Sequence, residues 1–164
     1  MSEKTLLAMR HAKSSWKNEG LTDFDRPLNK RGQAAAPFMA EILAERNLVP
    51  QLIISSSAER AKQTSLAMIA TWSKEVNLIL DDSLYLAGPN NYLQSIALHA
   101  VEEDSVMVVG HNPGMEFLID HLAGEDEIMP TAAVAILSGS SSWQELNSCN
   151  LHDVLRPKDL SSDL

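Results

Sequence analysis

Cysteine is nearly missing from this chain of 164 residues, which has one, Cys149. A single cysteine cannot form an internal disulfide, so we expect a buried, inert thiol and a cytoplasmic location. No apolar run approaches the length of a membrane-spanning helix. The first residues lack the basic region and apolar core of a secretion signal. These absences indicate an ordinary globular protein, and its length predicts one domain over residues 1–164.

Lysine and arginine are missing from the whole stretch between Glu75 and Leu155. The chain is acidic, with a formal net charge of -9, which argues against nucleic acid as a partner. Six of its cations nevertheless lie close together in sequence: Arg10, Lys13, Lys17, Arg26, Lys30 and Arg31. An acidic protein that keeps such a cationic zone can concentrate an anionic substrate there, although solvated surface charge is the simpler interpretation of the lysines.

Motifs of several other enzyme classes are also absent. The sequence has no His-Glu-x-x-His motif or cysteine pair for zinc, and no Walker A or G-x-G-x-x-G loop for a nucleotide. It has no G-x-S-x-G nucleophile elbow either. Asp81 and Asp82 could serve a metal or accept a phosphoryl group, but solvated residues at a strand end explain them more simply.

What is present is an alternation of strand-like and helix-like segments, which predicts an α/β fold. Strands are expected over residues 5–9, 51–55, 76–80 and 106–109, and helices over residues 30–46, 58–72, 90–101 and 113–122. Two late strands, 131–137 and 143–150, are expected to pair antiparallel around a turn at 138–142. Residues 12–28 form a long polar connection, and residues 156–164 a polar C-terminal tail.

Polar residues and prolines mark the limits of two of these helices. Asn29 is expected to be the N-cap of the helix over residues 30–46. Pro37 lies inside that helix and predicts a kink or a restart. Asn112 is expected to be an N-cap as well, with Pro113 at the first helical position, where proline is favoured.

Two histidines follow directly on strand-like runs. Arg10 and His11 come after residues 6–9, and His111 comes after residues 106–110. In an open α/β sheet, ligands bind beyond the carboxyl ends of the strands. If both runs belong to one parallel sheet, His11 and His111 emerge at the same edge. Purely structural roles remain the alternative for each residue, but their convergence suggests chemistry on an anion.

Arg60 lies in the first turn of the helix expected over residues 58–72. Ser56 and Glu59 have the spacing of a capping box, with Ser56 as the N-cap and Glu59 at the N3 position. A cation is poorly placed there because the helix dipole already makes that end positive. One explanation is an ion pair with Glu59 or a loop carboxylate. The other is an anion held by the guanidinium and the helix end together.

Three motifs, taken in order, resemble the histidine phosphatase superfamily, also called phosphoglycerate mutase-like. They are strand-Arg10-His11, Ser56-x-x-x-Arg60-x-x-x-Thr64, and Val109-Gly110-His111-Asn112. The short length, the segment 10–16, the block 25–32 and the Pro-Lys-Asp-Leu run at 157–160 are similar to the SixA-type phosphohistidine phosphatases. The resemblance implies a three-layer α/β/α sandwich with a mostly parallel central sheet.

The resemblance further implies that His11 is the nucleophile and that Arg10, Arg60 and His111 form the phosphate pocket. A neutral nitrogen of His11 can attack phosphorus if an acceptor holds the other ring nitrogen. Arginine forks match phosphoryl oxygens, and a protonated His111 adds a donor where negative charge develops. The expected course is a phosphohistidine intermediate on the enzyme followed by hydrolysis, and it needs neither a metal nor an organic cofactor.

Three positions depart from the superfamily pattern. Ala12 stands where a glycine usually follows the Arg-His pair, Lys17 where an asparagine is usual, and Leu86 where the general acid, a glutamate, is expected. Expelling an alkoxide is hard without a proton donor, whereas imidazole leaves phosphohistidine easily, so phosphoramidates or aryl phosphates are the favoured substrates. A displaced donor is the alternative, and its candidates are Asp25, Glu59 and Asp82.

The expected activity is the dephosphorylation of phosphohistidine on a signalling or phosphotransfer protein. One alternative is a phosphatase for a small phosphorylated metabolite, and another is a phosphate-binding module without turnover. A flavodoxin-like or receiver-type domain is more distant, because it would use Asp81 and Asp82 and leave His11 dispensable. Neither nucleic acid nor a membrane is an expected partner.

Overall fold

A six-stranded sheet forms the centre of the computed structural model, which describes residues 3–139 and 142–161. Its strands are β1 (Lys4–Arg10), β2 (Leu52–Ser56), β3 (Asn77–Asp81), β4 (Ser105–Gly110), β5 (Val134–Gly139) and β6 (Cys149–Leu155). They lie in the order β3-β2-β4-β1-β5-β6. The pairs β3-β2, β2-β4 and β4-β1 are parallel, whereas β5 is antiparallel to both β1 and β6. The predicted mostly parallel sheet is therefore confirmed.

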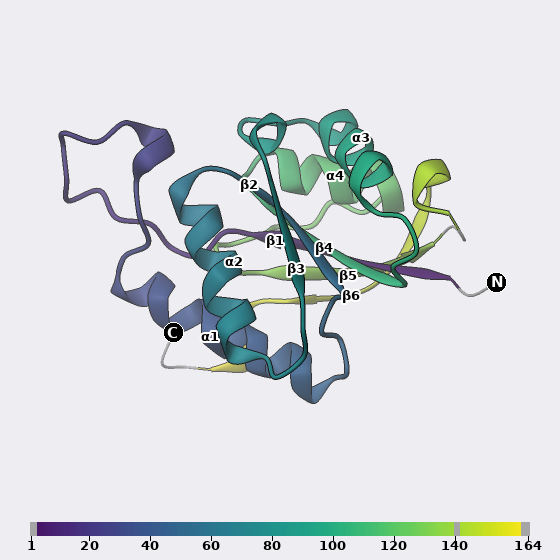
Figure 1. Cartoon of the computed structure of the whole chain (residues 1–164), viewed down its shortest axis with the longest axis horizontal. Coiled ribbons are helices and arrows are strands. Elements are labelled where there is room, and N and C mark those ends of the chain that lie inside the picture. Colours follow the sequence, from purple (N-terminus) through teal and green to yellow (C-terminus); the bar gives the residue numbers. More distant parts are fainter. Residues whose placement is uncertain (1–2, 140–141, 162–164) are drawn as a thin grey trace.

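Helices cover both faces of this sheet (Figure 1). On one face lie α1 (Lys30–Glu45) and α2 (Glu59–Thr71), and on the other α3 (Pro89–His99) and α4 (Gly114–Ala123). Strand β1 shows why both faces must be covered, because Leu7 and Met9 enter the core beneath α1 and α2 while Leu6 and Ala8 enter the opposite core. The three-layer α/β/α sandwich is confirmed. None of the described helices is both long and apolar enough to cross a bilayer.

Short elements connect or follow the layers. They are the 3-10 turns η1 (Asp23–Asp25), η2 (Asp82–Leu84) and η3 (Trp143–Glu145), and the C-terminal helix α5 (Pro157–Leu160). Helix α5 falls within the predicted polar tail, yet its Pro157 is buried. The last part of that tail, residues 162–164, lies outside the described residues.

The register of the two central strands brings the two histidines to the same level. Arg10 of β1 lies opposite Gly110 of β4, and the backbone N–H of His11 donates to the carbonyl oxygen of Gly110 at 2.9 Å. A Cβ atom on Gly110 would lie 1.9 Å from the hydroxyl oxygen of the buried Tyr92, so no larger residue fits at the end of β4. Because the strands are parallel and in register, the residues that follow them leave the sheet at one edge.

The start of α1 agrees with the prediction. The side chain of Asn29 accepts a hydrogen bond from the backbone N–H of Gly32 at 2.9 Å, which confirms the N-cap. The helix then continues through Pro37 to Glu45, so there is no restart at the proline.

The predicted N-cap at Ser56 is wrong. Helix α2 begins at Glu59, with Ala58 in the cap position, so Glu59 is the first helical residue and not the third. The Ser56 hydroxyl lies 2.8 Å from Nε2 of His111. A side chain that the capping pattern assigned to the helix contacts the functional site.

The predicted N-cap at Asn112 is also wrong, for a similar reason. Helix α4 begins at Gly114 with Pro113 in the cap position. The side-chain amide of Asn112 donates to Oε2 of Glu116 at 2.9 Å and to the carbonyl oxygen of Met129 at 2.8 Å. It therefore joins α4 to the segment before β5.

The two late strands pair antiparallel as predicted, but the second is misplaced. Strand β6 begins at Cys149, whereas Trp143 opens the turn η3. Its buried indole Nε1 donates to the carbonyl oxygen of Glu103 at 2.6 Å. Strand β5 starts at Val134 and continues to Gly139, and residues 140–141 of the predicted turn lie outside the described residues.

Candidate functional site

A cavity of about 440 Å³ opens at the carboxyl ends of β1 and β4. It is lined by Arg10, His11, Lys13, Ser14, Trp16, Asp23, Arg26, Arg60, Leu86, His111, Asn112 and Thr131. The structure thus brings together the four residues expected to meet, namely Arg10, His11, Arg60 and His111. The imidazole rings of His11 and His111 have their centroids 5.1 Å apart. This cavity is the candidate active site, and we call it the catalytic pocket.

The ring of His11 is held in one tautomer. Its Nδ1 donates to the carbonyl oxygen of Ala12 at 2.7 Å, which leaves the lone pair on Nε2. The Nε–H of Arg60 points at this Nε2 atom from 3.3 Å. Burial, and then the charges of His111, Arg60 and Arg10, lower the pKa of His11 to about 3. The ring is therefore neutral at pH 7 and has the electronic state of a nucleophile.

Thr64 connects the loop after β1 to helix α2. Its hydroxyl oxygen accepts from the backbone N–H of Ala12 at 3.0 Å, and the hydroxyl donates to the carbonyl oxygen of Arg60 at 2.7 Å. Ala12 follows His11 in the chain, and Arg60 begins the helical turn that ends at Thr64. One buried hydroxyl therefore fixes the position of His11 relative to Arg60.

Arg60 forms an ion pair with a loop carboxylate, one of the two arrangements left open by the sequence. Its Nη2 lies 3.0 Å from Oδ2 of Asp23, and its Nη1 donates to the carbonyl oxygen of Asp23 at 2.6 Å. The hydroxyl of Tyr85 donates to the same Oδ2 at 2.5 Å, and Arg26 lies 3.0 Å from Oδ1. The hydrogen bond from Tyr85, followed by those from Arg60 and Arg26, lowers the pKa of Asp23 to about 2.

Arg26 organises the long loop at the mouth of the pocket. Its guanidinium carbon lies 3.4 Å from the ring centroid of Trp16, a close cation-π contact. Its Nη1 also donates to the hydroxyl of Ser14 at 2.7 Å. Trp16 as a whole is 75% exposed, and it stands at the rim of the pocket.

His111 is fixed from two sides. Its Nε2 lies 2.8 Å from the Ser56 hydroxyl, and its backbone N–H donates to the hydroxyl oxygen of Tyr92 at 3.3 Å. Its Nδ1 is buried and has no hydrogen-bond partner among the described residues. Burial, and then the charge of Arg60, lower the pKa of His111 to about 4. The ring is thus neutral at pH 7, and a negative charge placed beside it would raise that pKa.

Arg10 is positioned by a network around Met129. Its Nη1 donates to the carbonyl oxygen of Met129 at 3.2 Å. Oε2 of Glu116 accepts from the backbone N–H of Met129 at 2.8 Å and also from the amide of Asn112. Nε of Arg10 is buried without a hydrogen-bond partner in the described part of the chain. The sequence did not point to Glu116, because nothing in its spacing separates it from other surface carboxylates.

None of the three candidate acids is among the described residues that line the pocket. Asp25 is exposed in η1, and its carboxylate accepts from the hydroxyl of Thr22 at 2.9 Å. Glu59 is the half-buried first residue of α2, and Asp82 is exposed in η2 beyond the end of β3. Leu86 does line the pocket, and its side chain is 77% exposed.

The carboxylate that does line the pocket, within the described residues, is Asp23. Asp23 was not among the residues predicted from the sequence. The available signal was its position three residues before Arg26, a spacing at which opposite charges can meet on one turn. No three His, Cys, Asp or Glu side chains of the described ranges are grouped so that they could hold a metal ion.

Comparison with known proteins gives a consistent picture. A model of the histidine phosphatase superfamily (branch 1) matches residues 6–85. The solved structure of an Agrobacterium tumefaciens protein named as the phosphohistidine phosphatase SixA is 34% identical. It aligns with 96% of this chain and 100% of its own, with a TM-score of 0.82. A protein histidine phosphatase SixA complexed with tungstate is 22% identical, with a TM-score of 0.78 over 96% of this chain and 99% of that one.

Two further matches are more distant or partial. An Escherichia coli protein named for α-ribazole-5'-P phosphatase activity shares the fold at 15% identity and a TM-score of 0.68, over 95% of this chain and 98% of its own. An uncharacterised chloroplast protein of Arabidopsis thaliana is 46% identical over 67 residues, which are 41% of this chain. The chain spans 31% of the length of that curated relative.

Proposed function

Because the chain belongs to the histidine phosphatase superfamily and, within it, to the SixA-type branch, we propose that it removes phosphate from phosphohistidine on a protein. Superfamily membership supports a phosphatase, and the proposal adds the substrate and the roles of individual residues. The observation that carries it is the meeting of Arg10, His11, Arg60 and His111 in one pocket. The whole activity resides in one domain, which acts in the cytoplasm.

His11 is the nucleophile in this proposal. Its unprotonated Nε2 attacks the phosphorus atom, and the bond from phosphorus to the imidazole nitrogen of the substrate breaks. The released imidazole takes up a proton from water. A second water then attacks the phosphorus on His11, the bond from Nε2 to phosphorus breaks, and inorganic phosphate leaves. The hydrogen bond from Nδ1 to Ala12 keeps the ring in the required tautomer through both steps.

Arg10, Arg60 and His111 stabilise the phosphoryl group as it is transferred. The guanidinium groups donate to its oxygens, where charge accumulates in the transition state. A bound dianion raises the pKa of His111 from its value of about 4, which favours the protonated ring and adds a further donor. The phosphoryl group also competes with Asp23 for the guanidinium of Arg60.

The state of Asp23 supports a substrate with an easy leaving group. With a pKa of about 2, this carboxylate is ionised at pH 7 and has no proton to donate. Leu86 supplies none either. Phosphohistidine needs less help from an acid than an alkyl phosphate ester does, because imidazole is a far better leaving group than an alkoxide.

The surroundings of the pocket favour a protein over a small metabolite. Three large apolar side chains near its opening remain exposed, with 75% of Trp16, 77% of Leu86 and 56% of Phe117 accessible. Leu86 and Phe117 also line a shallow depression next to His111. Such side chains around a polar pocket are typical of a surface that contacts another protein.

Rapid quenching with a labelled phosphodonor tests the proposal. We expect an acid-labile, alkali-stable adduct on His11, absent from His11→Asn and retained in His121→Asn, which changes an exposed histidine of α4. Turnover of a phosphohistidine protein should also exceed that of a panel of alkyl phosphate esters. A label on another residue overturns the role of His11, and a preference for alkyl esters favours a small metabolite as the substrate.

A further inference from the structure

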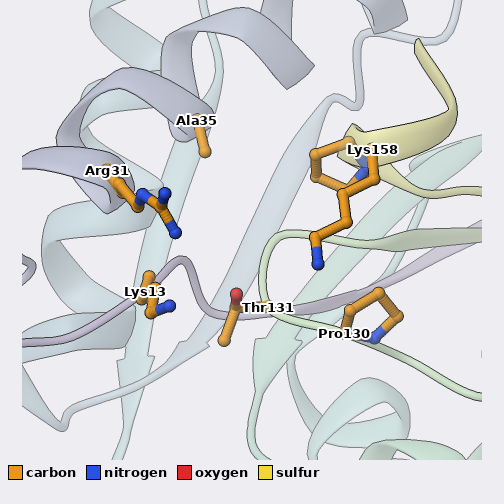
Figure 2. Close-up of a pocket in the computed structure, with 7 residues that line it drawn as sticks. Lys13, Arg31, Ala35, Pro130, Thr131 and Lys158 are labelled. Atoms are coloured by element: carbon orange, nitrogen blue, oxygen red, sulfur yellow. The ribbon is translucent and has the colours of Figure 1, made fainter. Parts of the chain in front are cut away.

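A second cavity, of about 170 Å³, adjoins the catalytic pocket between α1 and α5. It is lined by Lys13, Arg31, Ala35, Pro130, Thr131, Pro157 and Lys158. Lys13 and Thr131 line both cavities, so the two are adjacent. In Figure 2, Lys13 and Arg31 approach from one side and Lys158 from the other, with the hydroxyl of Thr131 between them. We call this space the cationic cavity.

Charge is the unusual property of the cationic cavity. It contains three cations in a protein of net charge -9, and the described residues that line it include no Asp or Glu. Lys13, Arg31 and Lys158 form no ion pair with a carboxylate of the described residues, whereas Arg26 and Arg60 in the neighbouring pocket do. Three like charges repel one another, and an anion between them removes that repulsion.

Close backbone contacts hold Lys13 beside α1. The backbone N–H of Asn29 donates to the carbonyl oxygen of Lys13 at 3.0 Å. A Cβ atom on Gly32 would lie 2.1 Å from that same oxygen. The approach of the loop to the helix therefore requires glycine at this position, and it places Lys13 next to Arg31.

The part of the cationic cavity formed by Thr131 is anchored to Arg10 and His11. Ala132 has a positive φ of 66°, and its backbone N–H donates to the carbonyl oxygens of Arg10 at 3.1 Å and His11 at 3.0 Å. These bonds fix the adjacent Thr131 relative to the nucleophile. Lys158 is carried by α5, which is attached to the body through buried Pro157 and through Leu160 packed on the core.

We propose that the cationic cavity binds a carboxylate of the substrate protein close to its phosphohistidine. The inference rests on the proposed function and narrows it, because it specifies a phosphohistidine with an aspartate or glutamate beside it. The phosphoryl group enters the catalytic pocket while the acidic side chain lies among Lys13, Arg31 and Lys158. Charge-assisted hydrogen bonds to Arg31 and to Thr131 then select acidic partners.

The test uses a double variant, Arg31→Gln with Lys158→Gln, in the full chain. Both residues are exposed and lie outside the catalytic pocket. The control, Lys30→Gln with Lys74→Gln, changes the net charge equally at two exposed lysines that do not line the cationic cavity. Thermal unfolding establishes that both variants are folded. The substrates are phenyl phosphate, phosphohistidine peptides with acidic or neutral flanking residues, and an aliphatic bisphosphate beside its monophosphate.

We expect the double variant to raise KM for the acidic peptide by about 5- to 20-fold, from the loss of two charge-assisted contacts. KM for the neutral peptide and for phenyl phosphate should change less than about 2-fold, and the control should resemble the wild type with every substrate. Added salt should reduce the preference of the wild type for the acidic peptide and have little effect on the double variant.

Equal effects on the acidic and neutral peptides, or the same effects in the control, would overturn the inference. If the double variant raises KM for the bisphosphate alone, a carboxylate is excluded as the ligand of the cationic cavity. The ligand would then be the second phosphate of a small molecule. If no phosphohistidine peptide is hydrolysed while phenyl phosphate is, the proposed substrate fails. In that case the bisphosphate tests whether the cationic cavity binds an anion at all. A lower KM for the bisphosphate than for the monophosphate in the wild type, lost in the double variant, would support an anion site. Equal KM values for the two compounds in the wild type would exclude it.

Discussion

Arg60 directs its Nε–H at Nε2 of His11 from 3.3 Å, and its two other nitrogens at Asp23. The guanidinium therefore contacts both the proposed attacking atom and the carboxylate that would compete with a phosphoryl group for it. This geometry needs a planar fork with several donors in fixed directions, which lysine lacks. Keeping the positive charge at position 60 is then insufficient to keep the function.

Arg60→Lys should lower kcat/KM for phenyl phosphate by about 100-fold or more, because one ammonium group cannot serve His11 and the phosphoryl oxygens together. Steady-state kinetics measures the loss, and circular dichroism verifies the fold. Lys62→Arg, on the same helix and outside the pocket, is the control. Activity within about 3-fold of the wild type would show that charge alone is sufficient.

Stability should fall in acid because of the two buried histidines. In the unfolded chain each imidazole takes up a proton near its ordinary pKa of about 6.5, whereas in the folded chain the pKa of His11 is about 3 and that of His111 about 4. Between pH 6.5 and 4 the unfolded chain therefore binds more protons than the folded chain does. The free energy of unfolding decreases as the pH falls through this range. The contribution of the two histidines to the pH dependence fades as the pH rises through 6.5, because the unfolded imidazoles then also lose their protons.

Urea unfolding at several pH values measures this effect. Each unit by which folding lowers a pKa corresponds to about 1.4 kcal/mol of stability. Replacing His11 by Asn should therefore flatten the plot of the free energy of unfolding against pH between pH 6.5 and 4. His121→Asn, in which the lost imidazole is exposed, should keep the wild-type slope. Parallel curves for the wild type and His11→Asn would contradict a strongly lowered pKa at His11.

Asp23→Asn should tighten the binding of inorganic anions. The substitution removes a negative charge 3.0 Å from Nη2 of Arg60, and with it a competitor for the guanidinium. The inhibition constant of inorganic phosphate, the product of the proposed reaction, should fall by about 2- to 5-fold, the scale of one partly exposed ion pair. Asp25→Asn makes the same change of charge in the same turn, outside the pocket lining, and should have little effect. Weaker inhibition would show that Asp23 mainly positions Arg60.

Thr64→Val should destabilise the fold and slow the reaction. The change leaves the backbone N–H of Ala12 without its buried acceptor, at a cost of about 1–3 kcal/mol. Thr71→Val is the matched control, since Thr71 lies on the same helix and its hydroxyl donates only within it, to the carbonyl of Ala67. Chemical unfolding and kcat are measured for both. Equal losses in the two variants would argue against a special role for Thr64.

The arrangement of the central strands could be predicted because it depends on simple rules. The apolar runs before Arg10 and before His111 are buried on both faces, and parallel strands place the following residues at one edge. The position of Asp23 could not be predicted in the same way. It lies in a polar loop whose shape is set by Arg26 and Trp16 together, and no local pattern describes such a contact.

The wrong caps have a common physical cause. Ser56 and Asn112 have the residue types and spacings that cap helices, yet each has a partner that is distant in sequence. For Ser56 the partner is His111, and for Asn112 it is the carbonyl of Met129. Local propensity gives way where tertiary hydrogen bonds are available, and both exceptions fall next to the catalytic pocket.

The pairing of β1 with β4 also determines when this protein becomes competent during folding. His11, the proposed nucleophile, and His111 are 100 positions apart in the sequence, and each stands only one residue beyond its strand. A chain in which those strands have not yet joined has no place to receive a phosphoryl group, however much helix it has formed. Phosphatase activity would therefore report the completed sheet, because the proposed pocket exists only after β1 and β4 have paired.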